Sequence, residues 1–311
     1  MKHCLLRRLL GLVPLLLGIS FLSFVLIQLS PGDPAEVAIR VNDQTPTPEL
    51  LAEVRTQLGL DRPFPERYLR WLADVVRGDL GTSYVNGRPV AGELARALPP
   101  TLMLAGTAAV IMLACSLAVA LVCVRHEGRV VDRLLRALLF LGTSVPAFWA
   151  GLLLIWLFSV HLDWLPTGGL EGPSSLVLPA VTLALPYLAA YARLLRNSMV
   201  QTAQEDFVLY ARACGRSRGA ILRMVLRNSL QASLTALGMS LPKLVAGSFV
   251  VECIFAWPGL GRLCVTAIFN RDLPVIQAYV LLMAVLFVAG NLCMDICAGL
   301  LDPRLRERGL R

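Results

Sequence analysis

Residues 205–230 read EDFVLYARACGRSRGAILRMVLRNSL and lie between two long apolar runs. This stretch holds five arginines and two carboxylates, whereas the whole 311-residue chain is 56% hydrophobic and only 16% charged. The mean hydropathy is +0.67, and soluble domains carry roughly one charged residue in four. The composition therefore favours a membrane protein in which residues 205–230 form a polar segment outside the bilayer.

Six apolar windows approach the roughly 20 residues that a helix needs to cross a bilayer core. They lie at residues 9–29, 102–124, 137–160, 176–192, 234–256 and 276–301. We expect the first to be a retained helix, because its apolar run exceeds the core of a signal peptide. Prolines at 146, 186 and 242 are expected to interrupt spans. The sequence thus predicts an all-α polytopic membrane protein with six transmembrane helices.

Basic residues are distributed unequally between alternate connecting segments. The segments expected inside hold 18 of the 29 Lys and Arg residues, and those expected outside hold 10, eight of them in one long loop. Because the positive-inside bias acts mainly through short loops, we expect both termini and residues 205–230 in the cytoplasm.

The long loop is expected to form a small helical extracytoplasmic region. One helix is predicted to begin at Pro48, capped by Thr47, and another near Pro65. The second helix is expected to place Tyr68, Leu69, Leu72 and Val76 on its apolar side. These expectations divide the chain into a first transmembrane helix (1–29), an extracytoplasmic region (30–100) and a permeation core with five transmembrane helices (101–311).

The polar stretch itself has the pattern of two amphipathic helices joined by a turn. Apolar residues recur at helical spacing in the first helix, at Val200, Ala203, Phe207, Tyr210 or Ala211, and Cys214. Gly215 suits a left-handed helix end, and Ser217 can cap a second helix that begins at Arg218. That helix carries an apolar side made of Ile221, Leu222, Val225, Leu226 and Ser229. Arg223 and Arg227 lie on another side.

Three functions are compatible with such a basic helix pair. It could rest on anionic lipid, dock to a cytoplasmic partner, or bind nucleic acid. Nucleic-acid binding is the least supported, because no aromatic residues alternate with the arginines. Spacing alone leaves the first two open.

The pattern EDFVLYARACG followed by LRNSL resembles the EAA loop of binding-protein-dependent ABC importer permeases. The resemblance implies that a short helix docks in a groove of the ATP-hydrolysing subunit. It assigns residues 198–232 as the coupling loop, with the matching positions Glu205, Asp206, Ala211, Arg212, Ala213, Gly215 and Arg218. Gln231 and Ala232 depart from the Leu-Pro usual in this branch, so the second helix is expected to continue into the fifth span.

Further motifs resemble the oligopeptide, dipeptide and nickel branch of these permeases, B-type subunit. They are SPGDPA (30–35), LGLDRP (58–63), GDLGTS (78–83), RPV (88–90), LPPT (98–101), VECIFAWPGLG (251–261), AIFNRDLPVIQ (267–277) and LDPRLR (301–306). PTPELL (46–51), FAWPGLGR and AIFNRD are most similar to the nickel permease.

The resemblance implies a bacterial inner-membrane location and import of nickel, free or chelated, or of small peptides. The implied partners are a second homologous permease subunit, two cytoplasmic ATPase subunits and an extracytoplasmic binding protein. The sequence contains no phosphate-binding loop, so we expect no ATP hydrolysis by this chain, no enzymatic activity and no cofactor.

Three ionisable residues fall in predicted spans, where such groups are costly and usually functional. Lys243 is a candidate for the translocation path or for a structural pair with Asp295, and Glu252 for orienting residues 257–275. Cys293 and Cys297 could form a metal relay with Asp295, although membrane cysteines usually serve as packing residues. A rival interpretation is a self-contained channel or secondary transporter that uses Lys243, Glu252 and Asp295.

Overall fold

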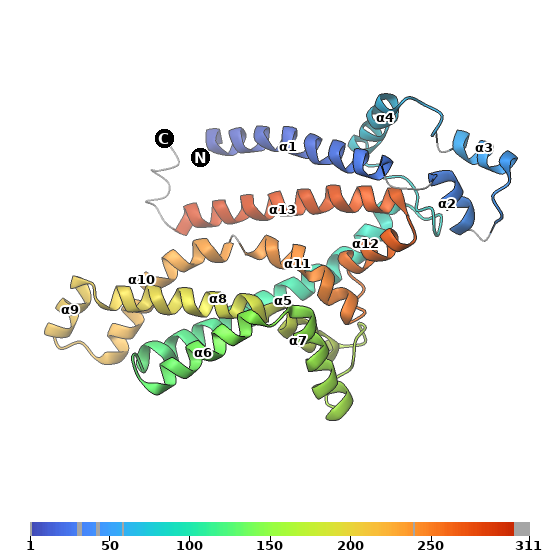
Figure 1. The fold of residues 1–311 in the computed structure, drawn as a ribbon. Coiled ribbons are helices and arrows are strands. Elements are labelled where there is room, and N and C mark those ends of the chain that lie inside the picture. Colours follow the sequence, from blue (N-terminus) through green and yellow to red (C-terminus); the bar gives the residue numbers. More distant parts are fainter. Residues whose placement is uncertain (1, 30–32, 42–43, 58, 239, 302–311) are drawn as a thin grey trace. The chain divides into compact units, whose positions relative to one another are not determined.

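The computed structural model describes residues 2–301 except 30–32, 42–43, 58 and 239. Within these residues all the regular secondary structure is helical, and an isolated bridge between Thr82 and Pro89 is the single β-type contact. Figure 1 shows the succession of helices and connecting loops. The all-α prediction is confirmed for the described part of the chain.

The helices follow one another with mostly short connections. Their bounds are α1 (Lys2–Gln28), α2 (Pro34–Val41), α3 (Pro48–Gln57), α4 (Phe64–Val76), α5 (Val90–Arg125), α6 (Val130–Ser144), α7 (Ala147–Leu154), a π-helix (Ile155–His161), a 3₁₀-helix (Pro173–Leu176), α8 (Val177–Ala203), α9 (Asp206–Ala213), α10 (Arg218–Gly238), α11 (Leu241–Ile254), α12 (Leu260–Phe269) and α13 (Leu273–Leu301).

The chain divides into two compact units, which are described separately. One comprises Met1–Thr101 with Pro258–Val288, and the other Leu102–Trp257 with Ala289–Arg311.

In the first unit, aromatic residues attach α4 to α1. Phe24 lies 5.4 to 6.0 Å, centroid to centroid, from the rings of Phe64, Tyr68 and Trp71. Of the residues predicted on the apolar side, Tyr68 and Leu72 are half-buried, whereas Leu69 and Val76 are 62% and 81% exposed. The aromatic residues decide which side of α4 is covered.

A second contact in this unit fastens the loop before α5 to the start of α13. The Asp272 carboxylate accepts hydrogen bonds from the Ser83 hydroxyl and from the backbone N–H of Tyr84, the latter at 3.1 Å. Asp272 is buried, so the carboxylate is held by these donors rather than by water.

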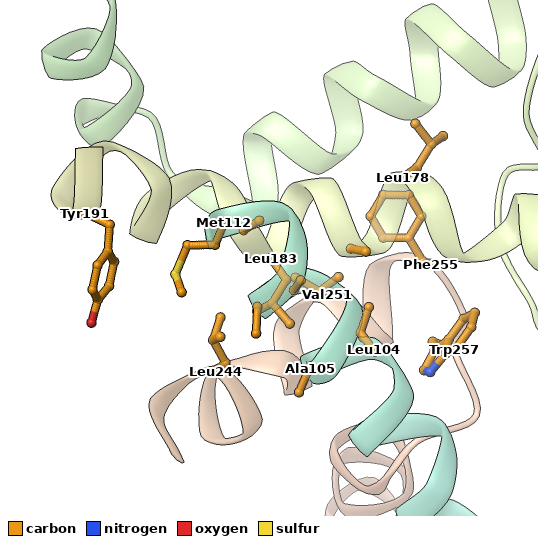
Figure 2. Close-up of a cluster of buried hydrophobic side chains, with 14 residues drawn as sticks. Leu104, Ala105, Met112, Leu178, Leu183, Tyr191, Leu244, Val251, Phe255 and Trp257 are labelled. Carbon is orange, nitrogen blue, oxygen red and sulfur yellow. The ribbon is translucent and has the colours of Figure 1, made fainter. Parts of the chain in front are cut away.

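In the second unit, a hydrophobic core joins α5, α8 and α11 (Figure 2). Leu104, Leu183, Val251 and Phe255 are among its buried members. Two glycines let backbones approach this core. A Cβ on Gly151 would meet the side chains of Thr182 and Phe255 at 3.1 and 3.3 Å.

Gly168 is more tightly enclosed, because a Cβ there would overlap the carbonyl oxygen of Phe255. The neighbouring Gly169 N–H donates to this oxygen at 2.8 Å. The loop before α8 is therefore pinned to the end of α11 by a contact that only glycine permits.

Three helices of the described chain are long and apolar enough to cross a membrane: Val90–Arg125, Pro173–Ala203 and Leu273–Cys293. They include the predicted windows 102–124 and 176–192 and much of 276–301. A fourth candidate, Val130–Gly142 with Ala147–His161, is bent by 103°. The predicted window 137–160 is therefore not one straight helix, since Pro146 precedes a new helix, α7.

The window 234–256 is likewise divided between α10 and α11, with Pro242 in the first turn of α11. Pro186 behaves differently and lies inside the continuous helix α8. The first window coincides with α1, of which Val13–Leu26 is a shorter apolar stretch. The count of six spans stays a prediction.

We predict that Gly168→Ala destabilises the protein by about 3 kcal/mol, since overpacking against fixed backbone forces the two segments apart. The thermal unfolding temperature of the purified protein in detergent should fall. Gly172→Ala is the control, because a Cβ there meets nothing within 4 Å. An unchanged unfolding temperature for Gly168→Ala would contradict the pinned contact.

Candidate functional site: the helical projection at 204–217

The chain changes direction between α8 and α10 through the short helix α9. Helix α8 ends at Ala203, Gln204 closes it, and Glu205 has an extended backbone (φ −69°, ψ 149°) before α9 begins at Asp206. The expectation of one continuous first helix from Met199 to Cys214 is therefore wrong. The break shifts the register, so the predicted apolar side is not the one that packs.

Helix α9 is anchored by Val208 and Ala211. Val208 is fully buried and Ala211 is 5% exposed. Val208 packs in a cluster that also contains Ala120, Leu195, Met199 and Val225, from α5, α8 and α10. Only Ala211 of the predicted apolar positions beyond Ala203 is buried. The anchor fixes which side of α9 faces away from the protein.

The opposite side of α9 exposes large apolar side chains. Leu209 and Tyr210 are 66% and 73% exposed, and Phe207, one turn before Ala211 on the flank of this side, is 39% exposed. Glu205, Asp206, Arg212 and Ala213 are exposed as well. A short helix that exposes aromatic and aliphatic groups beside both signs of charge is suited to binding another protein surface.

Gly215 ends α9 in the way the sequence predicts. Its φ is +71°, a conformation that costs other L-residues about 1–2 kcal/mol. The Gly215 N–H donates to Arg212 O at 3.0 Å, and the Arg216 N–H donates to Ala211 O at 3.1 Å. These two bonds form a Schellman motif, which satisfies carbonyls at the helix end.

The second helix of the projection also begins where predicted. The Ser217 hydroxyl accepts from the Ala220 N–H at 3.4 Å, and α10 starts at Arg218. Val225 and Ser229 are buried, while Arg223 and Arg227 are exposed, so the predicted sides of α10 are confirmed. Ser229 also donates to Thr202 of α8 at 3.1 Å. The two long helices are thus tied together at the base of the projection.

Helix α10 continues to Gly238, which confirms that the helix is unbroken at Gln231 and Ala232. The side chains of these two residues lie outside the described part of the structure. Residue 239, which lies in the connection between α10 and α11, is also outside the described residues.

The sequence matches known protein families over the residues of this projection and beyond. Residues 111–307 match the family "Binding-protein-dependent transport system inner membrane component", and residues 1–105 match the corresponding N-terminal family. The chain belongs to this permease family. It is accordingly a membrane-embedded permease subunit of a binding-protein-dependent ABC importer, and not itself an enzyme.

Individual relatives match over nearly the whole length of the permease. It is 41% identical over 304 residues to the metal-staphylopine import system permease protein CntB of Staphylococcus aureus, covering 97% of both chains. It is 39% identical over 309 residues to the glutathione transport system permease protein GsiC of Salmonella paratyphi A, covering 99% and 100%.

A chain of the MetNI methionine ABC transporter, crystallised in inward-facing conformations, shares the fold. Its TM-score is 0.57 at 19% identity, and the match covers 67% of the permease and 96% of that chain. The rival interpretation as a self-contained channel or secondary transporter is not supported, because the family and the relatives are components of ATP-driven importers.

Two of the residues predicted for a translocation path, Lys243 and Glu252, differ in exposure. Lys243 is exposed on α11, and its carbonyl oxygen accepts from the Tyr187 hydroxyl at 3.2 Å. Glu252, further along α11, is fully buried, and its carboxylate accepts from Ser248 at 2.9 Å. The Trp257 N–H donates to the Glu252 carbonyl at 2.8 Å. Glu252 is therefore part of a packed turn.

The possible metal relay finds no support in the described part of the permease. Cys293 is exposed on α13, whereas the side chains of Asp295 and Cys297 lie outside the described residues. No group of three or more His, Cys, Asp or Glu side chains that could hold a metal occurs among the residues searched.

Sequence reasoning missed a buried ion pair between α6 and α8. Asp132 is fully buried and makes a two-point contact with Arg196, with N–O distances of 2.8 Å. The available signal was an acidic residue within the arginine-rich sequence RVVDRLLR at 129–136. Its partner lies 64 residues away, which no local pattern reveals.

We predict that Gly215→Ala loosens the end of α9, because alanine must adopt a left-handed conformation there. A cost of about 1 kcal/mol should raise amide exchange in residues 207–214 roughly fivefold, as measured by hydrogen–deuterium exchange.

Gly219→Ala is a matched control, since a Cβ at either glycine meets nothing within 4 Å and only the backbone angle differs. It should leave exchange unchanged or slower, because alanine favours a helix. Equal exchange in both variants would contradict the role of Gly215.

Proposed function

We propose that α9 is the coupling helix through which the cytoplasmic ATPase moves this permease. The observation that carries the proposal is the two-sided character of α9. Val208 and Ala211 fix it to the permease, while Leu209 and Tyr210 are exposed on the opposite side and Phe207 is exposed on the flank. The resemblance of residues 205–215 to the EAA loop supports the same assignment.

The arrangement suits transmission of force better than attachment to lipid. A helix of eight residues has little stability by itself, so its orientation depends on the buried anchor and the Gly215 turn. A partner that presses on the exposed side therefore displaces α8 and α10 together, because both contribute to the anchoring cluster.

We predict that Leu209→Asp and Tyr210→Asp each abolish copurification of the ATPase subunit with the permease. The exposed fractions of 66% and 73% imply that the permease itself folds and inserts normally. Buried apolar groups at the centre of an interface commonly contribute 2 kcal/mol or more, about a 30-fold loss of affinity.

Arg223→Gln, exposed on α10, is the control and should retain the ATPase. Val208→Ala should instead lower thermal stability by about 2 kcal/mol, because it removes the buried anchor. If both aspartate variants retained the ATPase fully, the proposed docking on α9 would be contradicted, and the alternative that α9 rests on the lipid surface would be favoured.

The complete importer would contain this permease, a second homologous permease subunit, two ATPase subunits and an extracytoplasmic binding protein. Family membership supports the ATPase and binding-protein partners, and the resemblance to the B-type branch supports the second permease. The distribution of arginines supports a cytoplasmic location for both termini and for α9. In this arrangement residues 1–29 form the first span, residues 30–100 the extracytoplasmic region and residues 101–311 the permease core.

We further propose that the imported substrate is a small chelated metal, such as nickel, or a small peptide. The relatives named for metal-staphylopine and for glutathione transport, a metal chelate and a tripeptide, support this class. Exposed Lys243 is the candidate to attract a substrate carboxylate. Asp295 is a further candidate for the translocation path or for a structural pair with Lys243. Buried Glu252 is better suited to orienting the turn that leads to α12.

Uptake by the reconstituted importer tests this function. Proteoliposomes that contain both permeases, the ATPases and the binding protein should accumulate labelled nickel, with or without a chelator, or labelled glutathione, only when ATP is supplied. Lys243→Ala should lower uptake without altering assembly, and Arg193→Ala, exposed on α8, should not. Uptake without the ATPase would contradict the importer mechanism.

A further inference from the structure

The buried carboxylate of Asp132 stands at the centre of a polar cluster near the C-terminal end of α8. The cluster contains Cys123, Gly128, Asp132, Arg136 and Arg196 and is called the Asp132 cluster below. None of its residues belongs to α9 or to the candidates for the translocation path.

The main contact of the cluster joins α6 to α8. Arg196 Nε donates to Asp132 Oδ1 and Arg196 Nη2 donates to Oδ2, both at 2.8 Å. This fork geometry fixes the two side chains in orientation as well as in distance. Asp132 has no exposed surface and the Arg196 side chain is 15% exposed, so water competes little for either group.

The same carboxylate also holds the connection between α5 and α6. The Gly128 N–H donates to Oδ2 at 3.3 Å, and the buried Cys123 of α5 lies close to the same carboxylate. Arg136, one turn later on α6, lies 3.5 Å from Oδ1. One side chain therefore links α5, the turn, α6 and α8.

On the α8 side, the cluster lies next to the anchor of α9. Arg196 follows Leu195 and is nearly one turn before Met199, and both neighbours are buried in the cluster that contains Val208 of α9 and Val225 of α10. A helix transmits displacement along its axis because its hydrogen bonds resist compression. Movement of α9 therefore reaches Arg196 within two turns of the end of α8.

Stability is a weak explanation for this arrangement. A buried ion pair costs desolvation of both charges, and apolar residues of similar volume often replace it without loss. What the pair supplies is a directional, two-point connection between α8 and α6 that apolar packing does not reproduce.

We propose that Asp132 is a positioning residue for transport, which through Arg196 carries the displacement of α8 to the α5–α6 turn and to α6. This inference rests on the proposed docking of the ATPase on α9. It predicts that α6 follows the nucleotide state of the ATPase only while the pair is intact.

The test is hydrogen–deuterium exchange of the fully assembled importer, without nucleotide and trapped with ATP and vanadate. In the unaltered importer, nucleotide should change exchange both in α9 and in residues 126–136. In Asp132→Asn the change in α9 should remain, and the change in residues 126–136 should be lost.

A second variant separates positioning from simple stability. Asp132→Leu combined with Arg196→Met removes both charges and keeps the packing volume, so the importer should assemble with normal thermal stability and still lose the response in 126–136. Arg193→Gln, exposed on α8, should respond like the unaltered importer.

A retained response of 126–136 in Asp132→Asn, or in the double variant, overturns the proposal, because packing alone would then carry the movement. If nucleotide caused no change of exchange in α9 of the unaltered importer, the proposed docking of the ATPase would be contradicted. The role proposed for Asp132 would then be contradicted as well, because it depends on that docking.

Discussion

The packing of α8 is the constraint on which the described core depends. Helix α8 contacts α6, α7, α10 and α11, and eleven of its residues are buried. The hydrophobic core of α5, α8 and α11 lies along its first half, and the cluster that anchors α9 lies at its end. A displacement at either end of α8 is therefore felt by its neighbours, which is the property required of an element that connects an ATPase to a membrane pathway.

The two ends of α8 are held by different physical means. At the start, close backbone contact at Gly168 and the aromatic ring of Phe255 leave little freedom. At the end, polar contacts add to the apolar cluster that anchors α9: the Arg196–Asp132 pair and the bond between Ser229 and Thr202. Apolar packing changes gradually as helices slide, whereas directional hydrogen bonds are made or broken. The C-terminal end of α8, which has such bonds, is thus better suited to respond to a partner.

Much of the projection could be predicted from local sequence. The left-handed end at Gly215, the cap at Ser217 and the buried side of α10 all depend on residues within a few positions of one another. Thr47 before α3 is another local feature that was predicted correctly, since its hydroxyl accepts from the Leu50 N–H. Such features follow from backbone chemistry and need no knowledge of distant contacts.

Features that depend on distant contacts were missed. The exposure of Tyr210 and the burial of Val208 follow from the break at Gln204 and Glu205, which has no glycine or proline to mark it. The exposed side of α4 depends on aromatic residues of α1. Asp132 and Arg196 meet only because α6 packs on α8. In each case the spacing of apolar residues identifies a helix, but the neighbouring helix that packs on it decides which side is covered.

The most direct test of the account is photocrosslinking from α9 in the assembled importer. A benzoylphenylalanine placed at Tyr210, which is 73% exposed, should crosslink to the ATPase subunit. The same group at Phe269, which is the last residue of α12 and 83% exposed, should give no ATPase product. Crosslinking from position 210 to lipid alone, with none to the ATPase, would contradict the account.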